Sequence, residues 1–502
     1  MLEGLLAAIS PTNLLIEIVG VIVGIIFGAI PGLTATLAIA LFVPVTFLMS
    51  ADAGMIMLGG IYVGGIFGGS ISAILINVPG TPASIVTGWE GYSMAREGKA
   101  PLALSFAALS SGIGGLLSAA ALLFLTPVLS SFALRFGPAD YCALLLFSFA
   151  IVIVMMETPL MRNLLGCCIG LLLVTIGLDP VTGDARFTFG NVDLMSGFNL
   201  VAVLIGLFCM TEAVFLACDS LDKSSNTEVI GFGKETSYAK LLKMVFTRAF
   251  TYIRSSTIGI FLGILPAVGP VTTPFIAHAV ERRFNRKDEK FGKGSITGLI
   301  AAEASNSANV GGSLVPLISL GIPGSGAAAV FIAALTLHGL QPGPLLFKNE
   351  SVLIYTFFWG FIAVNLFMMM FGLFGARYFA VVLKLPKSVL ATFIAFFSIL
   401  GSYAIQNSMF DVGVMFGATG LALWLRALRV PILPIVLAII LGPLFEQEAL
   451  VMFTTSSGVA EVLGRPIADG FFALTVVIVV VAIFTRLRKG PANALEVSRP
   501  AG

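Results

Sequence analysis

Long apolar stretches recur along the chain from about Leu14 to about Thr485, with glycine, proline and small polar residues between them. A helix needs about 20 mostly apolar residues to cross a bilayer, so this pattern predicts about 12 transmembrane segments, some of them broken. The composition agrees, because 58% of the residues are hydrophobic and 11% are charged, whereas about 25% of a typical soluble domain is charged. We therefore expect an all-α polytopic membrane protein.

Two of the apolar stretches carry a small residue at every fourth position. The two rows are Gly20, Gly24, Gly28 and Gly32, and Gly60, Gly64, Gly68 and Ser72. Residues four apart lie on one face of a helix, and small side chains there let a neighbouring backbone approach closely. Both rows are therefore predicted to be packing faces between transmembrane helices.

The second row leads into a predicted helix break at Pro79 and Gly80. Proline removes a backbone donor and glycine relaxes the limits on φ, so an apolar helix should stop there. A break at membrane depth persists only inside protein or beside a watery cavity. The residues at and beside this break that are predicted to bind a solute are Ser70, Asn77, Pro79, Gly80, Thr81 and Ser84.

The same motifs return in order in the second half of the chain. GIIFGAIP, which ends at Pro31, is matched by GIFLGILP, which ends at Pro266. The Gly-Gly-Ser of the first break and its Pro-Gly are matched by a second set that ends at Pro323 and Gly324. Two motifs in one order indicate homologous halves, and the predicted second break adds the candidate solute-binding residues Gly321, Pro323, Gly324 and Ser325.

The repeat divides the chain into predicted parts. These are a first membrane repeat (1–220), a cytoplasmic linker (221–248), a second membrane repeat (249–445), a C-terminal loop with a final transmembrane segment (446–489) and a disordered cytoplasmic tail (490–502).

Charge favours an inverted relation between the halves. The segment from Glu281 to Lys293 is rich in Lys and Arg and is predicted to be cytoplasmic, whereas its counterpart from Met49 to Gly54 has neither. Inversion would turn the two proline motifs into hairpins that enter from opposite sides. Their predicted tips are Pro31, Gly32, Pro266 and Gly269.

An unusually polar run, EASNSAN, precedes the second break. An ionisable group within a span is costly and is by default a candidate functional group, although Glu303 could instead pair across helices or lie near an interface. Amide oxygens suit a cation, and the alternative for the asparagines is interhelical hydrogen bonding. The predicted coupling-ion residues are Thr34, Thr36, Glu303, Ser305, Asn306 and Asn309.

Other chemistry finds little support. Helix N-termini after Gly80 and Gly324 would attract an anion without a buried arginine, so Arg135, Arg162 and Arg254, near the ends of apolar segments, are read as snorkelling side chains. We find no catalytic constellation, no metal-ligand spacing and no Walker motif, because GFGKET has the wrong spacing. We expect no cofactor and no nucleic-acid partner.

Two blocks resemble a known family. They are YVGGIFGGSISAILINVPGTPASIVTGWEGYSMAREGKAPLAL and FGKGSITGLIAAEASNSANVGGSLVPLISLGIPGSGAAAVFIAALTLHGLQPGP, and with the rest of the chain they resemble the large membrane subunit of the tripartite tricarboxylate transporters. One departure is Pro266-Ala267, where the family usually has Pro-Gly, so Val268 and Gly269 would have to supply the turn.

The resemblance implies a system of three components in a bacterial inner membrane. The chain would be the multi-pass translocation subunit, a small membrane subunit its partner in the lipid bilayer, and a periplasmic binding protein the receptor that delivers a carboxylate. It also implies import coupled to a cation, with Na⁺ expected. Movement of the site past a static scaffold, as in an elevator, is expected by analogy with related architectures.

Three alternatives stay open at the level of sequence. A stand-alone carboxylate symporter would work without a receptor, a channel would show no coupling, and an intramembrane enzyme would need a dyad that the sequence does not display. The solute also stays open among citrate, other tricarboxylates, dicarboxylates and aromatic acids.

Overall fold

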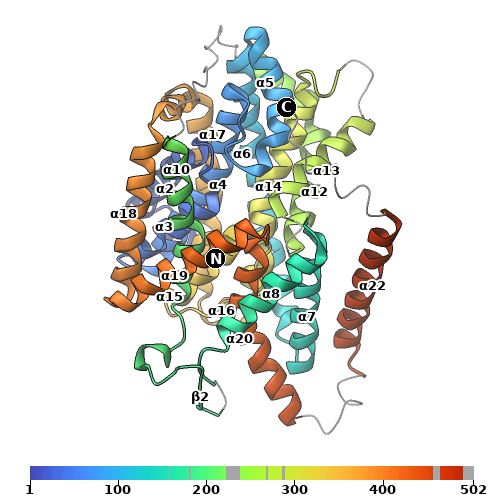
Figure 1. The fold of residues 1–502 in the computed structure, drawn as a ribbon. Helices are drawn as coiled ribbons and strands as arrows, with labels where there is room; N and C mark the ends of the chain where they lie inside the picture. Colours follow the sequence, from blue (N-terminus) through green and yellow to red (C-terminus); the bar gives the residue numbers. More distant parts are fainter. Residues whose placement is uncertain are drawn as a thin grey trace.

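The structure is a computed structural model that describes residues 1–156, 158–179, 182–221, 238–266, 269–284, 289–455 and 464–489. It is built almost wholly from helices (Figure 1). Up to the linker the elements are α1 (Leu2–Ala8), α2 (Pro11–Ala29), α3 (Ala35–Thr46), α4 (Ala51–Ile76), η1 (Pro82–Ser84), α5 (Ile85–Met94), η2 (Ala95–Lys99), α6 (Ala100–Ala133), α7 (Pro138–Met155), α8 (Leu160–Val174), β1 (Gly177–Leu178), β2 (Ala185–Arg186), η3 (Val192–Leu194), α9 (Leu200–Leu204), η4 (Ile205–Met210) and α10 (Thr211–Leu221).

The described elements from residue 238 on are helices, and the proposed repeat of the first half stays a prediction from the sequence. They are α11 (Tyr238–Thr247), α12 (Ala249–Ile264), α13 (Gly269–Phe284), α14 (Ile296–Leu320), α15 (Gly326–Leu337), α16 (Pro344–Asn349), α17 (Ser351–Phe379), η5 (Ala380–Lys384), α18 (Lys387–Gln406), α19 (Met409–Ala427), α20 (Ile432–Thr455) and α22 (Pro466–Lys489).

Within the described ranges, ten helical segments are long and apolar enough to cross a membrane, and four more apolar helices of 10–17 residues accompany them. The regular strands described are β1 and β2, which form one short antiparallel pair. The prediction of an all-α polytopic membrane protein is therefore confirmed.

The two predicted packing faces lie against each other. α2 and α4 are neighbours, and a Cβ atom at Gly20 would lie 2.6 Å from the carbonyl oxygen of Met57. In the other direction, Gly64 and Gly68 lie against the carbonyl oxygens of Val21 and Ile25. The backbones approach so closely because no side chain separates them. Gly32 does not continue the face, since α2 ends at Ala29.

Both predicted breaks are present. α4 ends at Ile76, where Asn77 adopts the left-handed conformation with φ 56°, and helix resumes at Pro82. α14 ends at Leu320, where Gly321 has φ 75°, and helix resumes at Gly326. The helices before the breaks form the centre of the molecule, because α4 from Ala53 to Leu75 and α14 from Gly298 to Ser319 are buried throughout.

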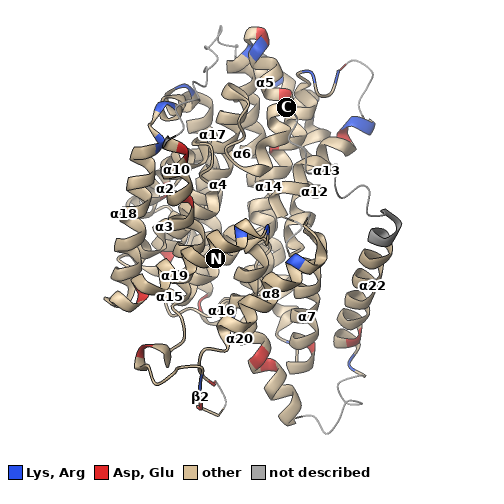
Figure 2. Cartoon of the chain, in the orientation of Figure 1, with Lys and Arg blue, Asp and Glu red and all other residues tan. Residues whose placement is uncertain are grey.

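Charged positions cluster at the ends of helices and in loops (Figure 2). Basic residues of η2, which follows α5, and of the last turn of α13 lie at the same end of the molecule. The buried Glu90 carboxylate joins α5 to the loop before α14, because it accepts hydrogen bonds from the amides of Gly292, Gly294 and Ser295 at 2.6, 3.0 and 2.8 Å. The inverted orientation of the halves stays a prediction from the charges.

Some predicted boundaries differ from the helices or fall elsewhere. α20 runs without interruption across the expected division between 445 and 446. α10 extends to Leu221, and most of the expected linker and the whole expected tail, 490–502, lie outside the described residues. The last span, α22, contacts α7 at the edge of the molecule (Figure 1).

Candidate solute-binding cavity

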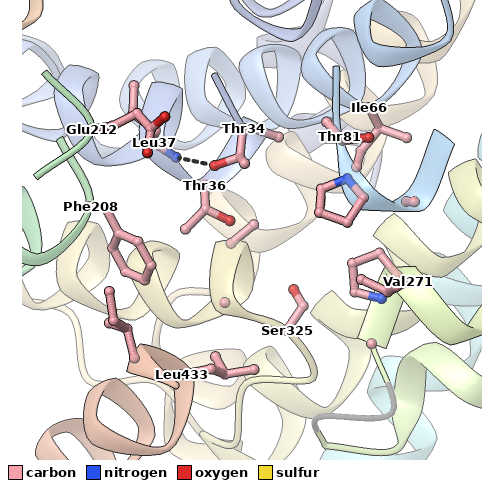
Figure 3. Close-up of a pocket in the computed structure, with 18 of the residues that line it drawn as sticks. Thr34, Thr36, Leu37, Ile66, Thr81, Phe208, Glu212, Val271, Ser325 and Leu433 are labelled. Atoms are coloured by element: carbon pink, nitrogen blue, oxygen red, sulfur yellow. Dashed lines mark hydrogen bonds between the residues drawn. The ribbon is translucent and has the colours of Figure 1, made fainter. Parts of the chain in front are cut away.

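A cavity of about 570 Å³ lies where the four helix interruptions meet. The α2–α3 hairpin contributes Gly32 and the first break contributes Thr81; the α12–α13 hairpin contributes Gly269 and the second break contributes Ser325. Figure 3 shows Thr34, Thr36, Thr81 and Ser325 around this space, with Phe208 and Leu433 on the apolar side. Segments far apart in the sequence thus form one site.

Four helices begin at the cavity wall directly after the four interruptions: α3, the η1–α5 helix, α13 and α15. A further helix, α20, also begins at the wall, at Ile432. Thr34 Oγ1 accepts a hydrogen bond from Leu37 N at 3.2 Å, and Ser325 Oγ accepts one from Ala328 N at 3.1 Å. The first turn of a helix still leaves other N–H groups without an intrahelical acceptor, and each N-terminus carries about half a positive charge. Convergence of four such ends favours an anionic solute.

Tyr62 is a cavity residue that the sequence reasoning missed. It lies on α4 and is buried, and its hydroxyl is 2.9 Å from Ser325 Oγ and 3.3 Å from Ser313 Oγ. It therefore links α4 of the first half to the break of the second half. One signal was available, because Tyr62 is the only phenolic hydroxyl in the otherwise apolar and small-residue helix α4.

Glu212 and Arg426 were also missed, and both line the cavity. Glu212 lies in the first turn of α10, and Arg426 lies in the last turn of α19. Their closest atoms, Arg426 Nη1 and Glu212 Oε2, are 3.6 Å apart. Glu212 could have been found, since an ionisable residue in an apolar span is a functional candidate by default. Arg426 lies at the end of an apolar helix and resembled other arginines at segment ends.

The remaining predicted solute-binding residues lie around the breaks in different ways. Ser84 is buried and its hydroxyl donates to Thr81 O at 2.8 Å, so it fixes the first break. Asn77 is exposed at the end of α4. The backbones of Pro79, Gly80, Gly321, Pro323 and Gly324 form the breaks themselves and do not line the cavity, within the described wall.

Glu303 lies outside the described cavity wall and accepts three hydrogen bonds. Its side chain is fully buried, and it accepts from Ser70 and Ser111 at 2.7 Å each and from Thr87. These hydroxyls belong to α4, α6 and α5, so one carboxyl group of the second half joins three helices of the first. Ser70, predicted to contact solute, is directed to Glu303 instead. Among the described residues no group of three His, Cys, Asp or Glu could hold a metal ion.

Asn306 and Asn309 are buried on the same helix with unused hydrogen-bonding capacity. Within the described residues, the Nδ2 and Oδ1 atoms of Asn306 and the Oδ1 atom of Asn309 have no hydrogen-bond partner. Asn309 Nδ2 donates to Thr273 Oγ1 of α13 at 3.1 Å. Ser305 donates to its own helix at Ala302 O. The structure therefore separates the predicted ion residues, because Thr34 and Thr36 line the cavity whereas the α14 group does not.

Two further expectations concern the second hairpin. Gly269 has φ 64°, a conformation that favours glycine, whereas Val268 lies outside the described residues. Arg254 was expected to snorkel, and this is corrected: its Nη2 donates to Glu281 Oε2 at 2.7 Å, and its guanidinium lies 4.1 Å from the centroid of the Phe284 ring. Glu281 is buried, so the arginine compensates a carboxylate.

The fold and the cavity together define a multi-pass membrane protein with broken helices around a central cavity, an architecture found among transporters. The family model of the Tripartite tricarboxylate transporter TctA family matches residues 14–437, and the chain belongs to this transporter family.

Two similar proteins come from Agrobacterium vitis. An uncharacterized 52.8 kDa protein in the TAR-I ttuC' 3' region is 34% identical over 491 residues, which is 97% of this chain and 96% of that protein. An uncharacterized protein in the TAR-II ttuC' 3' region is 32% identical over 235 residues, which is 46% of this chain and 96% of that protein. Neither name states a solute.

Proposed function

We propose that this chain is the translocation subunit of a receptor-dependent, Na⁺-coupled importer of tricarboxylates such as citrate, or of related dicarboxylates. The observation that carries the proposal is the convergence of four helix N-termini on one cavity. Its volume of about 570 Å³ lies within the range of roughly 300–1,000 Å³ typical of small-molecule sites. Carboxylates would bind the free amides and the hydroxyls of Thr34, Thr36, Thr81 and Ser325.

The α14 asparagines support the proposed coupling to a cation. Their unpartnered amide oxygens lie on a buried helix, where an unsatisfied polar group is costly. A bound Na⁺ would use such oxygens. We place the ion near Asn306 and Asn309 and the solute at the cavity, so that binding of one favours binding of the other through α14 and the second break.

The family is tripartite, which supports a small membrane subunit and a periplasmic binding protein as partners. A bacterial inner membrane is the matching location. Elevator-like movement of the cavity past a scaffold is part of the proposal, and a cysteine cross-link between moving and static helices that left transport intact would argue against it.

The test is uptake of labelled citrate and dicarboxylates into proteoliposomes that hold the large and small subunits, with and without receptor and a Na⁺ gradient. We expect uptake to need both. Thr36→Val should lower it, whereas Thr392→Val, which removes an exposed hydroxyl bonded to its own helix, should not. Uptake without receptor would favour the alternative, a stand-alone carboxylate symporter, and uptake without coupling would favour a channel.

A further inference from the structure

The cavity wall contains one pair of opposite charges. Among its described residues, Arg426 is the one basic side chain and Glu212 the one acidic side chain. They come from α19 and α10, which contact each other. Four helix ends already favour an anion, so a carboxylate in the wall opposes solute binding and an arginine supports it.

The pair is open enough to exchange partners. Arg426 Nη1 and Glu212 Oε2 are 3.6 Å apart, and 54% of the Arg426 side chain is exposed. The Arg426 guanidinium is also held 3.9 Å from the centroid of the Phe215 ring, which positions it without using its N–H donors. The Glu212 side chain is 20% exposed, and a single contact at this distance to a half-exposed arginine contributes little by itself. A solute carboxylate that binds the guanidinium with both oxygens would make the stronger contact.

Glu212 also lies at the tip of the first hairpin. Its Oε1 atom is 3.2 Å from the place that a Cβ atom on Gly32 would occupy, and Gly32 lies two residues before Thr34, the N-cap of α3. Figure 3 shows Glu212 next to Thr34 and Leu37 of that turn. The protein's own carboxylate thus lies beside one of the four helix ends and beside the only basic side chain of the described wall.

We propose that Glu212 is a tethered substitute for a solute carboxylate, and that Arg426 is the residue that selects solutes with more than one carboxylate. This inference rests on the proposed function. One carboxylate of the solute binds the helix ends at the two breaks. A second displaces Glu212 from Arg426, which a monocarboxylate cannot do while it occupies the breaks.

The test compares apparent affinities in proteoliposomes that contain both membrane subunits and receptor. Labelled citrate is the probe, and unlabelled citrate, succinate and butyrate compete with it. Arg426→Gln should lower the apparent affinity for citrate and for succinate by about tenfold or more, since it removes a charge-assisted pair. The apparent affinity for butyrate should change little. Arg426→Lys should restore part of the lost affinity, and Glu212→Gln should raise the apparent affinity for citrate. Arg429→Gln, on the same helix end but outside the described cavity wall, should behave as wild type.

Each result decides the inference. If Arg426→Gln lowered the apparent affinity for all three acids equally, Arg426 would only hold α19 against α10. If it lowered none of these affinities, the proposal would also be overturned. Weaker citrate binding by Glu212→Gln would contradict the substitute role. If wild-type protein takes up no carboxylate with receptor and Na⁺ present, the proposed function itself fails, and the two failures are therefore distinguishable.

Discussion

Gly80 lies so close to Gly28 that a Cβ atom at position 80 would collide with the Gly28 carbonyl oxygen. The second half has the same contact, because a Cβ atom on Gly324 would collide with the carbonyl oxygen of Gly263. Each break is also tied to the helix before it, by Gly80 N to Gly69 O and Gly324 N to Ser313 O, both at 3.4 Å. The Pro-Gly segments are thus seated against the hairpins that form the rest of the cavity wall.

Gly80→Ala and Gly324→Ala should each destabilise the protein by about 3 kcal/mol or more, since the colliding atom belongs to the backbone and cannot rotate away. The measurement is thermal unfolding in detergent, in which the folded protein that remains after heating is quantified by size-exclusion chromatography. Gly413→Ala is the control, because a Cβ atom there meets nothing within 4 Å; it should be neutral or stabilising by up to about 1 kcal/mol. Wild-type stability of Gly80→Ala would refute the close contact.

Glu303→Ala should lower the free energy of unfolding by about 3 kcal/mol or more, because it leaves the hydroxyls of Ser70, Thr87 and Ser111 without an acceptor in the interior. Glu303→Gln keeps one carbonyl acceptor and should cost less. The same unfolding assay with and without Na⁺ separates two roles for this residue. A role as a structural acceptor leaves the Na⁺ response of Glu303→Gln intact, whereas a role as ion ligand abolishes it.

Asn309→Ala should raise the Na⁺ concentration for half-maximal uptake by about tenfold, which corresponds to about 1.4 kcal/mol. The reason is the loss of an amide oxygen that has no partner among the described residues. Asn163→Ala is the control, because Asn163 is buried and its amide donates to Ile153 O at 2.8 Å. That variant should lose stability and keep the Na⁺ dependence. An unchanged Na⁺ dependence in Asn309→Ala would mean that the ion binds at another place in the protein.

Glu289, in the loop before α14, should make stability depend on pH. Burial disfavours its charge, but hydrogen bonds from Ser295 Oγ at 2.6 Å, Arg248 Nη2 at 2.8 Å and Thr297 N at 2.9 Å outweigh that effect. The pKa of Glu289 is therefore lowered from its ordinary value of 4.5. Its contribution to stability is complete above that ordinary value and is lost as the pH falls through the lowered pKa.

Unfolding curves of wild type and Glu289→Gln between pH 7 and pH 3 check this sign. The wild type should be more stable at pH 7, and the difference should shrink on acidification. Glu97→Gln serves as control, since Glu97 is an exposed residue that pairs with Lys99. A difference that grew towards low pH would contradict the assignment.

The helix breaks and their contacts were largely predictable because they are local or repeated. Proline and glycine disrupt a helix wherever they stand, so Pro79-Gly80 and Pro323-Gly324 marked both breaks. The rows of glycine predicted a close helix contact, and α2 against α4 confirms it. Residues that act through distant partners were harder to predict. Ser70 looked like a solute ligand by its place near the break, yet it binds Glu303.

The sequence by itself determined the membrane class, the helical architecture, the two breaks and the family, because hydrophobic length, proline chemistry and motif order are properties of the chain. Only the tertiary structure decided that the α2–α3 and α12–α13 hairpins share one cavity with the breaks, and that Tyr62, Glu212 and Arg426 join them. The physical reason is that side-chain direction and long-range contact depend on how buried helices pack, and small residues allow several faces to meet.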